Sequence, residues 1–109
     1  MKKLLDYNNV VAWGADKGIL DKSSPLAQSE KFMEEALEFI DEVKLLHTKP
    51  YPDSTLPAKM EYGDVLVTLI LYAELSGWDM DECLTLAYNK IATRNGKIID
   101  GLFVKDMAV

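Results

Sequence analysis

Two pairs of carboxylates, each with its members three residues apart, stand in separate parts of this 109-residue chain. Glu35 and Glu38 form the first pair, and Glu61 and Asp64 form the second. On a helix such a pair lies on one face, about one turn apart, so two helices could direct four oxygen ligands at one point. Mg²⁺ prefers oxygen ligands, completed by water and substrate phosphates. The spacing predicts a magnesium site between two facing helices, with Mn²⁺ as a substitute.

The second pair adjoins the most apolar stretch of the chain, residues 65–71. Carboxylates at the edge of a buried helix carry a desolvation cost unless a cation neutralises them. Gly63 stands between the two acids, and a glycine inside a helix costs roughly 0.5–1 kcal/mol relative to alanine. It therefore predicts close backbone packing or the approach of a ligand. The alternative is a solvated acidic face, or acids that complement a helix N-terminus.

Four helical segments are expected to position these carboxylates. Ser24 can cap a helix whose first residue is Pro25, and apolar residues then recur at spacings of three and four. Gly77 is a natural stop for the third segment, and Asp79 is a natural cap for the fourth. The expected helices cover about residues 4–16, 25–46, 58–76 and 79 to 94–96.

Two stretches are expected to be non-helical. Three prolines force an extended loop over residues 47–57. Residues 98–104 are two short apolar runs around Asp100 and Gly101, which predicts a small hairpin or an extended tail packed on the helices. The fold class is therefore an all-α bundle of four main helices with a short C-terminal tail.

The apolar stretch also carries a prediction about assembly. Its apolar side chains cover every direction around the helix axis, so the third helix is expected to be buried on all sides. In a chain this small, such burial is easier when a second subunit covers part of the helix. We therefore expect a homodimer or homotetramer.

Composition and charge narrow the class of protein. The length of 109 residues predicts a single domain over residues 1–109. The single cysteine, Cys83, excludes an internal disulfide and favours a reducing, cytoplasmic setting. No apolar run is long enough to span a membrane. A net charge of −6 argues against binding a nucleic-acid polymer, and an anionic substrate would need a cation or a local basic cluster.

A local basic cluster is present near the end of the fourth segment. Lys90, Arg94 and Lys97 follow one another at spacings of four and three, with Asn89 beside them, so they are expected to form one stripe on the helix and just past its end. Such a stripe could hold the phosphates of a nucleotide. The alternative is that cations near a helix C-terminus merely complement the helix dipole.

The order of these motifs resembles the all-α nucleotide pyrophosphohydrolases of the MazG-like superfamily, which includes dimeric dUTPases, dCTP pyrophosphatases and phosphoribosyl-ATP pyrophosphatases. Residues 13–20 look like the opening helix of small bacterial and phage members, and residues 89–105 look like the typical ending. The acidic residues match the EExxE…ExxD pattern of the family at Glu34, Glu35, Glu38, Glu61 and Asp64.

This resemblance implies an activity and a role for each matched residue. Glu35, Glu38, Glu61 and Asp64 match the metal ligands, and Glu34 matches the extra acid that could orient or deprotonate the attacking water. The implied reaction is Mg²⁺-dependent attack of water on the α-phosphorus of a nucleoside triphosphate, releasing the monophosphate and pyrophosphate. House-cleaning of nucleotide pools is one use of such an activity.

Further substrate contacts and competing functions stay open at this point. Gln28 and Lys31 precede the acidic motif as they do in the family, and this resemblance makes them candidates for substrate binding. Trp13 could stack on a base, although a tryptophan at helical apolar spacing is more often core. One alternative is a narrow dUTP or dCTP pyrophosphatase. Another is a non-catalytic helical oligomerisation or regulatory module with solvated acids.

Overall fold

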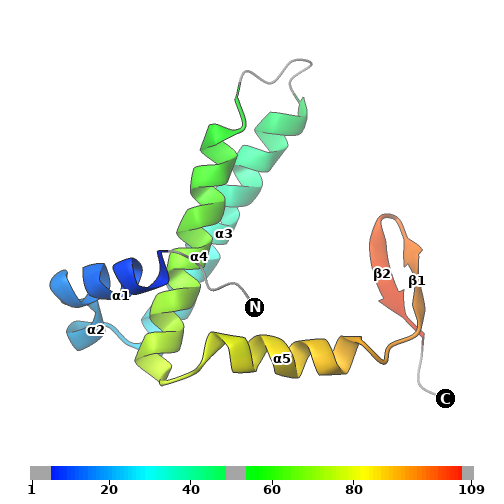
Figure 1. Ribbon diagram of the computed structural model, residues 1–109. Coiled ribbons are helices and arrows are strands. Elements are labelled where there is room, and N and C mark those ends of the chain that lie inside the picture. Colours follow the sequence, from blue (N-terminus) through cyan, green and yellow to red (C-terminus); the bar gives the residue numbers. More distant parts are fainter. Residues whose placement is uncertain (1–5, 49–53, 107–109) are drawn as a thin grey trace. The chain divides into compact units, whose positions relative to one another are not determined.

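The computed structural model describes residues 6–48 and 54–106 and is mostly helical (Figure 1). The chain divides into two compact units, Met1–Trp78 and Asp79–Val109, and each is described by itself. The predicted helical fold with a short C-terminal tail is confirmed. The elements in chain order are α1 (Tyr7–Asp16), α2 (Ile19–Lys22), α3 (Pro25–Thr48), α4 (Leu56–Ser76), α5 (Met80–Ile91), β1 (Gly96–Ile99) and β2 (Leu102–Lys105).

The first unit is built on α3 and α4, which pack against each other as an antiparallel pair (Figure 1). The predicted start of α3 is confirmed, because the Ala27 N–H donates a hydrogen bond of 3.1 Å to Ser24 Oγ and Pro25 opens the helix. Gly77 ends α4 in the left-handed conformation, at φ 68°, as its position predicted.

The bounds of the predicted loop between these two helices are wrong at both ends. His47 and Thr48 belong to the last turn of α3, and α4 already begins at Leu56. Pro57 stands in the first turn of α4, where a proline is tolerated because its missing N–H has no helical partner to lose. Residues 49–53 lie outside the described part of the chain.

Both α1 and the short α2 pack against α4. The Tyr7 hydroxyl donates a hydrogen bond of 2.8 Å to Glu74 Oε1, which fastens the start of α1 to the last part of α4. Gly14 is buried, and a Cβ added there would stand 2.6 Å from Cδ2 of Leu71. The sequence did not predict α2, which follows a left-handed Gly18 at φ 77°.

Burial of α4 is real but incomplete. Ile70, Leu71 and Ala73 form the buried apolar core, and Thr68 is buried beside them, its hydroxyl donating to the Val65 carbonyl. Leu69 is 38% exposed, so a single chain does not bury this helix on all sides. Cover by a second subunit stays a prediction.

The second unit consists of α5 and a two-stranded antiparallel hairpin. Asp79 caps α5 as predicted, its carboxylate accepting a hydrogen bond of 2.9 Å from the Asp81 N–H. The tail is a hairpin rather than an extended strand, with Ile99 opposite Leu102. Asp100 and Gly101 turn the chain at φ 52° and 81°, the two positive angles that a tight hairpin turn requires.

Among the residues that the structure describes, no helix has both the length and the apolar content needed to cross a membrane.

Candidate metal centre

Three of the predicted carboxylates meet between α3 and α4. Glu35 and Glu38 come from successive turns of α3, and Glu61 comes from the second turn of α4. One carboxylate oxygen from each lies within 4.8 Å of the others. The i, i+3 spacing aligns the first pair along α3, and the packing of the two helices brings Glu61 to them.

Two oxygens at this cluster are buried without a partner. Within the described part of the chain, Glu35 Oε2 and Glu61 Oε2 are inaccessible to solvent and accept no hydrogen bond. A buried carboxylate oxygen left without a partner is costly, because water solvates it well and the protein interior does not. A cation between the two helices would remove that cost at both oxygens.

Charge repulsion and burial act on the other acids of the cluster. The pKa of Glu38 is raised, chiefly because its protonated carboxyl can donate a hydrogen bond to Glu35, and then because of the negative charge of Glu35. The pKa of Glu61 is also raised, chiefly by burial and then by the charge of Asp64. Both shifts mean that burial and the neighbouring carboxylates disfavour the ionised forms of Glu38 and Glu61, and a divalent cation bound there would favour them.

The donor set suits a hard divalent ion. All three groups offer oxygen, and opposite ligands of Mg²⁺ are about 4 Å apart at its usual bond length, which is comparable with the 4.8 Å span of the cluster. Three carboxylates would also fill only part of the octahedral shell of Mg²⁺, which leaves positions for water and phosphate oxygens. The residues therefore fit the ion that the sequence predicted.

The fourth predicted ligand, Asp64, lies outside this close group. It stands one turn beyond Glu61 on α4, and its charge contributes to the raised pKa of Glu61, so it borders the cluster. Gly63, between these two acids, has open space where a Cβ would be, and the prediction of close backbone packing there is wrong. The space leaves this side of α4 accessible to a ligand.

Glu42 is a further acid near the cluster that the sequence analysis did not select as a candidate. It is half-buried, and its charge helps to raise the pKa of Glu61 across the helix pair. The signal was present in the spacing, since Glu42 stands four residues after Glu38 and so continues the same face of α3.

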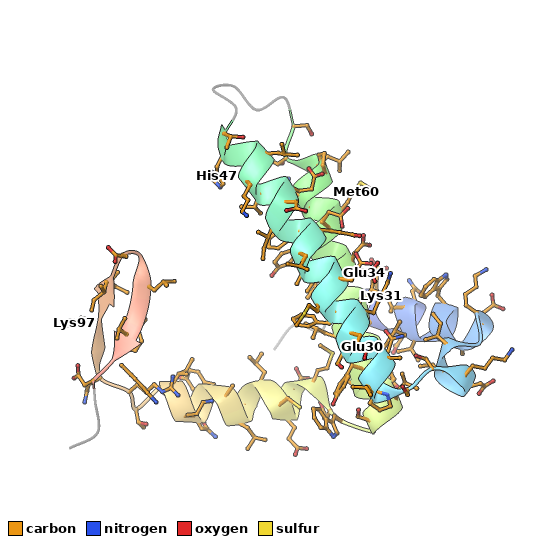
Figure 2. The ribbon with its side chains drawn as sticks, turned by 180° about the vertical axis from the view of Figure 1, so that it is seen from behind. Glu30, Lys31, Glu34, His47, Met60 and Lys97 are labelled. Carbon is orange, nitrogen blue, oxygen red and sulfur yellow. The ribbon has the colours of Figure 1, made fainter. Side chains whose placement is uncertain are left out.

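Lys31 is the cation nearest to the cluster among the described residues. Its Nζ lies 3.3 Å from Glu34 Oε1 and 3.3 Å from Glu35 Oε1. These contacts, chiefly the hydrogen bond to Glu34, raise the pKa of Lys31, so the ammonium remains charged. Figure 2 shows Lys31 and Glu34 together on the outer face of α3. Glu34 itself is 58% exposed at its side chain, unlike the largely buried Glu35 beside it.

The remaining candidates of the first unit have other surroundings. Gln28 is buried, and its side-chain amide donates a hydrogen bond of 3.1 Å to Ser23 Oγ, which ties the start of α3 to the preceding turn. Trp13 is 46% exposed on α1, so its ring is not in the core. A place for Gln28 or Trp13 in substrate binding stays a prediction.

The predicted basic stripe does not continue along one helix. Asn89 and Lys90 lie in the last turn of α5, which ends at Ile91. Arg94 follows in a turn, its N–H donating to the Ile91 carbonyl at 3.0 Å, and Lys97 lies in β1. The helical spacing was therefore applied past the end of the helix. All four side chains are exposed in the second unit.

Comparison with known proteins gives the class. A family model described as the MazG nucleotide pyrophosphohydrolase domain matches residues 23–99, most of the chain, and covers both the carboxylate cluster and the basic residues. The chain belongs to this family, as the resemblance of its motifs implied. Comparison of the chain with curated proteins and with solved structures found no match.

Proposed function

We propose that this protein hydrolyses nucleoside triphosphates to the monophosphate and pyrophosphate, using Mg²⁺ bound by Glu35, Glu38 and Glu61 with Asp64 at the edge of the site. The observation that carries the proposal is that three glutamates from two helices converge, and that two of their own carboxylate oxygens are buried without a hydrogen-bond partner. Membership of a nucleotide pyrophosphohydrolase family supports the nucleotide and the anhydride as the substrate and the bond that is cleaved.

The chemistry that the cation supplies when bound is polarisation of the α-phosphate and a lowered pKa for the attacking water. The three glutamates would hold the cation between α3 and α4. Glu34 stands next to this group with its carboxylate accessible to solvent, a position from which it could orient or deprotonate water. Its Oε1 also accepts from Lys31, so the other oxygen is the one left for that role.

The acidic protein needs a means to attract an anionic substrate, since its net charge is −6. The bound cation would offset most of the negative charge of the three glutamates and offer the phosphates a positive ion to coordinate. Lys90, Arg94 and Lys97 are exposed cations of the second unit, and we assign them to the β and γ phosphates. A homodimer or homotetramer is the assembly in which we expect this activity.

Pyrophosphate release from a panel of ribonucleoside and deoxyribonucleoside triphosphates, with Mg²⁺ or Mn²⁺, tests the proposal. We expect release that depends on the metal and is lost in Glu38→Gln, whereas Glu30→Gln retains it. Glu30 is a matched control because it is an exposed glutamate of the same helix and forms no ion pair with any described residue. A protein inert toward every nucleotide, with either metal, would contradict the proposal. Activity confined to dUTP or dCTP would narrow the substrate.

A further inference from the structure

We propose that Lys31 is a positioning residue that holds the Glu35 carboxylate with its inner oxygen directed at the cation. The inference rests on the proposed function, because it assigns Glu35 to the metal. It also departs from the sequence prediction, in which Lys31 contacted the substrate.

The two oxygens of Glu35 have opposite surroundings. Oε1 lies 3.3 Å from the Lys31 ammonium at the surface of α3, whereas Oε2 is buried and accepts no hydrogen bond from any described residue. The side chain of Glu35 is only 12% exposed. A carboxylate fastened at one oxygen has lost most of its freedom to rotate, so the second oxygen is presented in a fixed direction.

Lys31 is itself held in place from two sides. Glu34 Oε1 lies 3.3 Å from the same Nζ, so the ammonium bridges an exposed carboxylate and a buried one on adjacent residues of α3. The i, i+3 and i, i+4 spacings make both contacts possible without bending the helix. Ion pairs of this kind contribute little to stability when they are exposed. Their effect here is to fix the orientation of Glu35.

Charge repulsion and positioning predict opposite effects of Lys31 on metal affinity, and this makes the inference testable. An ammonium near a divalent cation repels it, so removing the charge of Lys31 would strengthen metal binding if repulsion were the dominant effect. If positioning dominates, the same change weakens metal binding, because Glu35 must then be ordered when the cation arrives. Groups that orient metal ligands usually change metal affinity by 10–100-fold when they are removed.

The test is calorimetric titration of the full chain with Mn²⁺ in the absence of nucleotide. Lys31→Met removes the charge and the hydrogen bonds, Lys31→Arg keeps both, and Lys44→Met makes the same change on α3 at a lysine that pairs with no described carboxylate. We expect Lys31→Met to raise the Kd for Mn²⁺ about tenfold, and Lys31→Arg to stay within about threefold of the wild type. Lys44→Met should bind like the wild type, and circular dichroism should show the same helix content in all variants.

The possible failures are distinguishable. Equal or tighter Mn²⁺ binding by Lys31→Met would overturn the positioning role while leaving the metal site intact. A wild-type chain that binds no Mn²⁺ would instead overturn the proposed function on which the role rests. With Mn²⁺ saturating, Lys31→Met should keep the KM for the nucleotide within about twofold. A raised KM combined with an unchanged Kd for Mn²⁺ would make Lys31 a substrate contact.

Discussion

The acids of the first unit and the cations of the second were chosen from the sequence by the same spacing, with different outcomes. Glu35 and Glu38 lie inside a long helix that packs along its length against another, and they meet Glu61. Lys90 and Arg94 span the end of α5, beyond which the chain turns into β1. Spacing predicts a shared face only where the helix continues through both residues, and partners on a second element fix that face in space.

This difference implies that charge changes in the two units should affect activity unequally. Under the proposed function, an acid in the convergent cluster would act together with its neighbours on one cation, so its loss should affect every step that needs the cation. A basic residue in the second unit would contribute one contact among several to a phosphate. The predictions below follow from this contrast, in order of decreasing effect.

The largest effect is expected from Glu61→Gln, which removes the charge that α4 contributes to the cluster. Activity with saturating nucleotide should fall about a hundredfold, because one of the three convergent oxygens becomes a neutral and weaker ligand. We expect Mg²⁺ to raise the Tm of the wild type, and this rise should be much smaller in the variant, because a ligand stabilises the folded state only as far as it binds. Kinetics and thermal denaturation with and without Mg²⁺ measure both. Full activity in this variant would remove the distinction between the two units.

A smaller effect is expected from Arg94→Gln in the second unit. The KM for the nucleotide should rise about tenfold with little change in kcat, because a phosphate contact made in both the ground and the transition state changes binding alone. Lys105→Gln, at the end of β2 and outside the predicted group, is the matched control. Steady-state kinetics measure the KM. An unchanged KM would favour the alternative that Arg94 merely complements the dipole at the end of α5.

A structural change in the first unit tests how closely α1 packs against α4. Gly14→Ala should lower stability by about 1 kcal/mol, because the added Cβ would stand 2.6 Å from the buried Leu71 and force it to shift. Chemical denaturation measures this change. Gly101→Ala, at φ 81° in the hairpin, is the corresponding glycine substitution in the second unit. It lies outside the carboxylate cluster, so the increase in stability that we expect from Mg²⁺ should remain in this variant. A fully stable Gly14→Ala variant would contradict the close packing of α1 on α4.

The smallest effect concerns the metal-free protein. Glu38→Gln should raise its Tm at pH 7 by about 2 °C, because it relieves repulsion among the three acids. The raised pKa of Glu38 means that the folded state binds its proton more tightly than the unfolded state does. Stability from this group is therefore present below pH 4.5 and is lost as pH rises through the raised pKa. The gain from the variant should grow over the same range, and thermal scans in EDTA measure it. A gain independent of pH would argue against repulsion as its cause.

Much of the fold was predictable because local chemistry decides it. Ser24, Pro25, Gly77 and Asp79 mark helix ends through their own hydrogen bonds and backbone angles, and each does so in the structure. The positive φ angles of Asp100 and Gly101 likewise close the hairpin. The prediction was wrong at α2 and at the end of α5, where the sequence carries no strong local signal for a helix start or a helix end. A glycine such as Gly18 indicates where a helix ends but not that a short helix follows it, and no residue directly after Ile91 marks a stop as clearly as Gly77 does.

The sequence by itself determined which residues share a face of each helix, because the helical repeat is a property of the backbone. It thereby placed Glu35 with Glu38, and Glu61 with Asp64. Tertiary structure alone decided that Glu61 joins the first pair while Asp64 stays at the edge, since that depends on how α4 lies against α3. It also decided that Lys31 takes one oxygen of Glu35 and leaves the other buried, because rotamers and burial follow from packing.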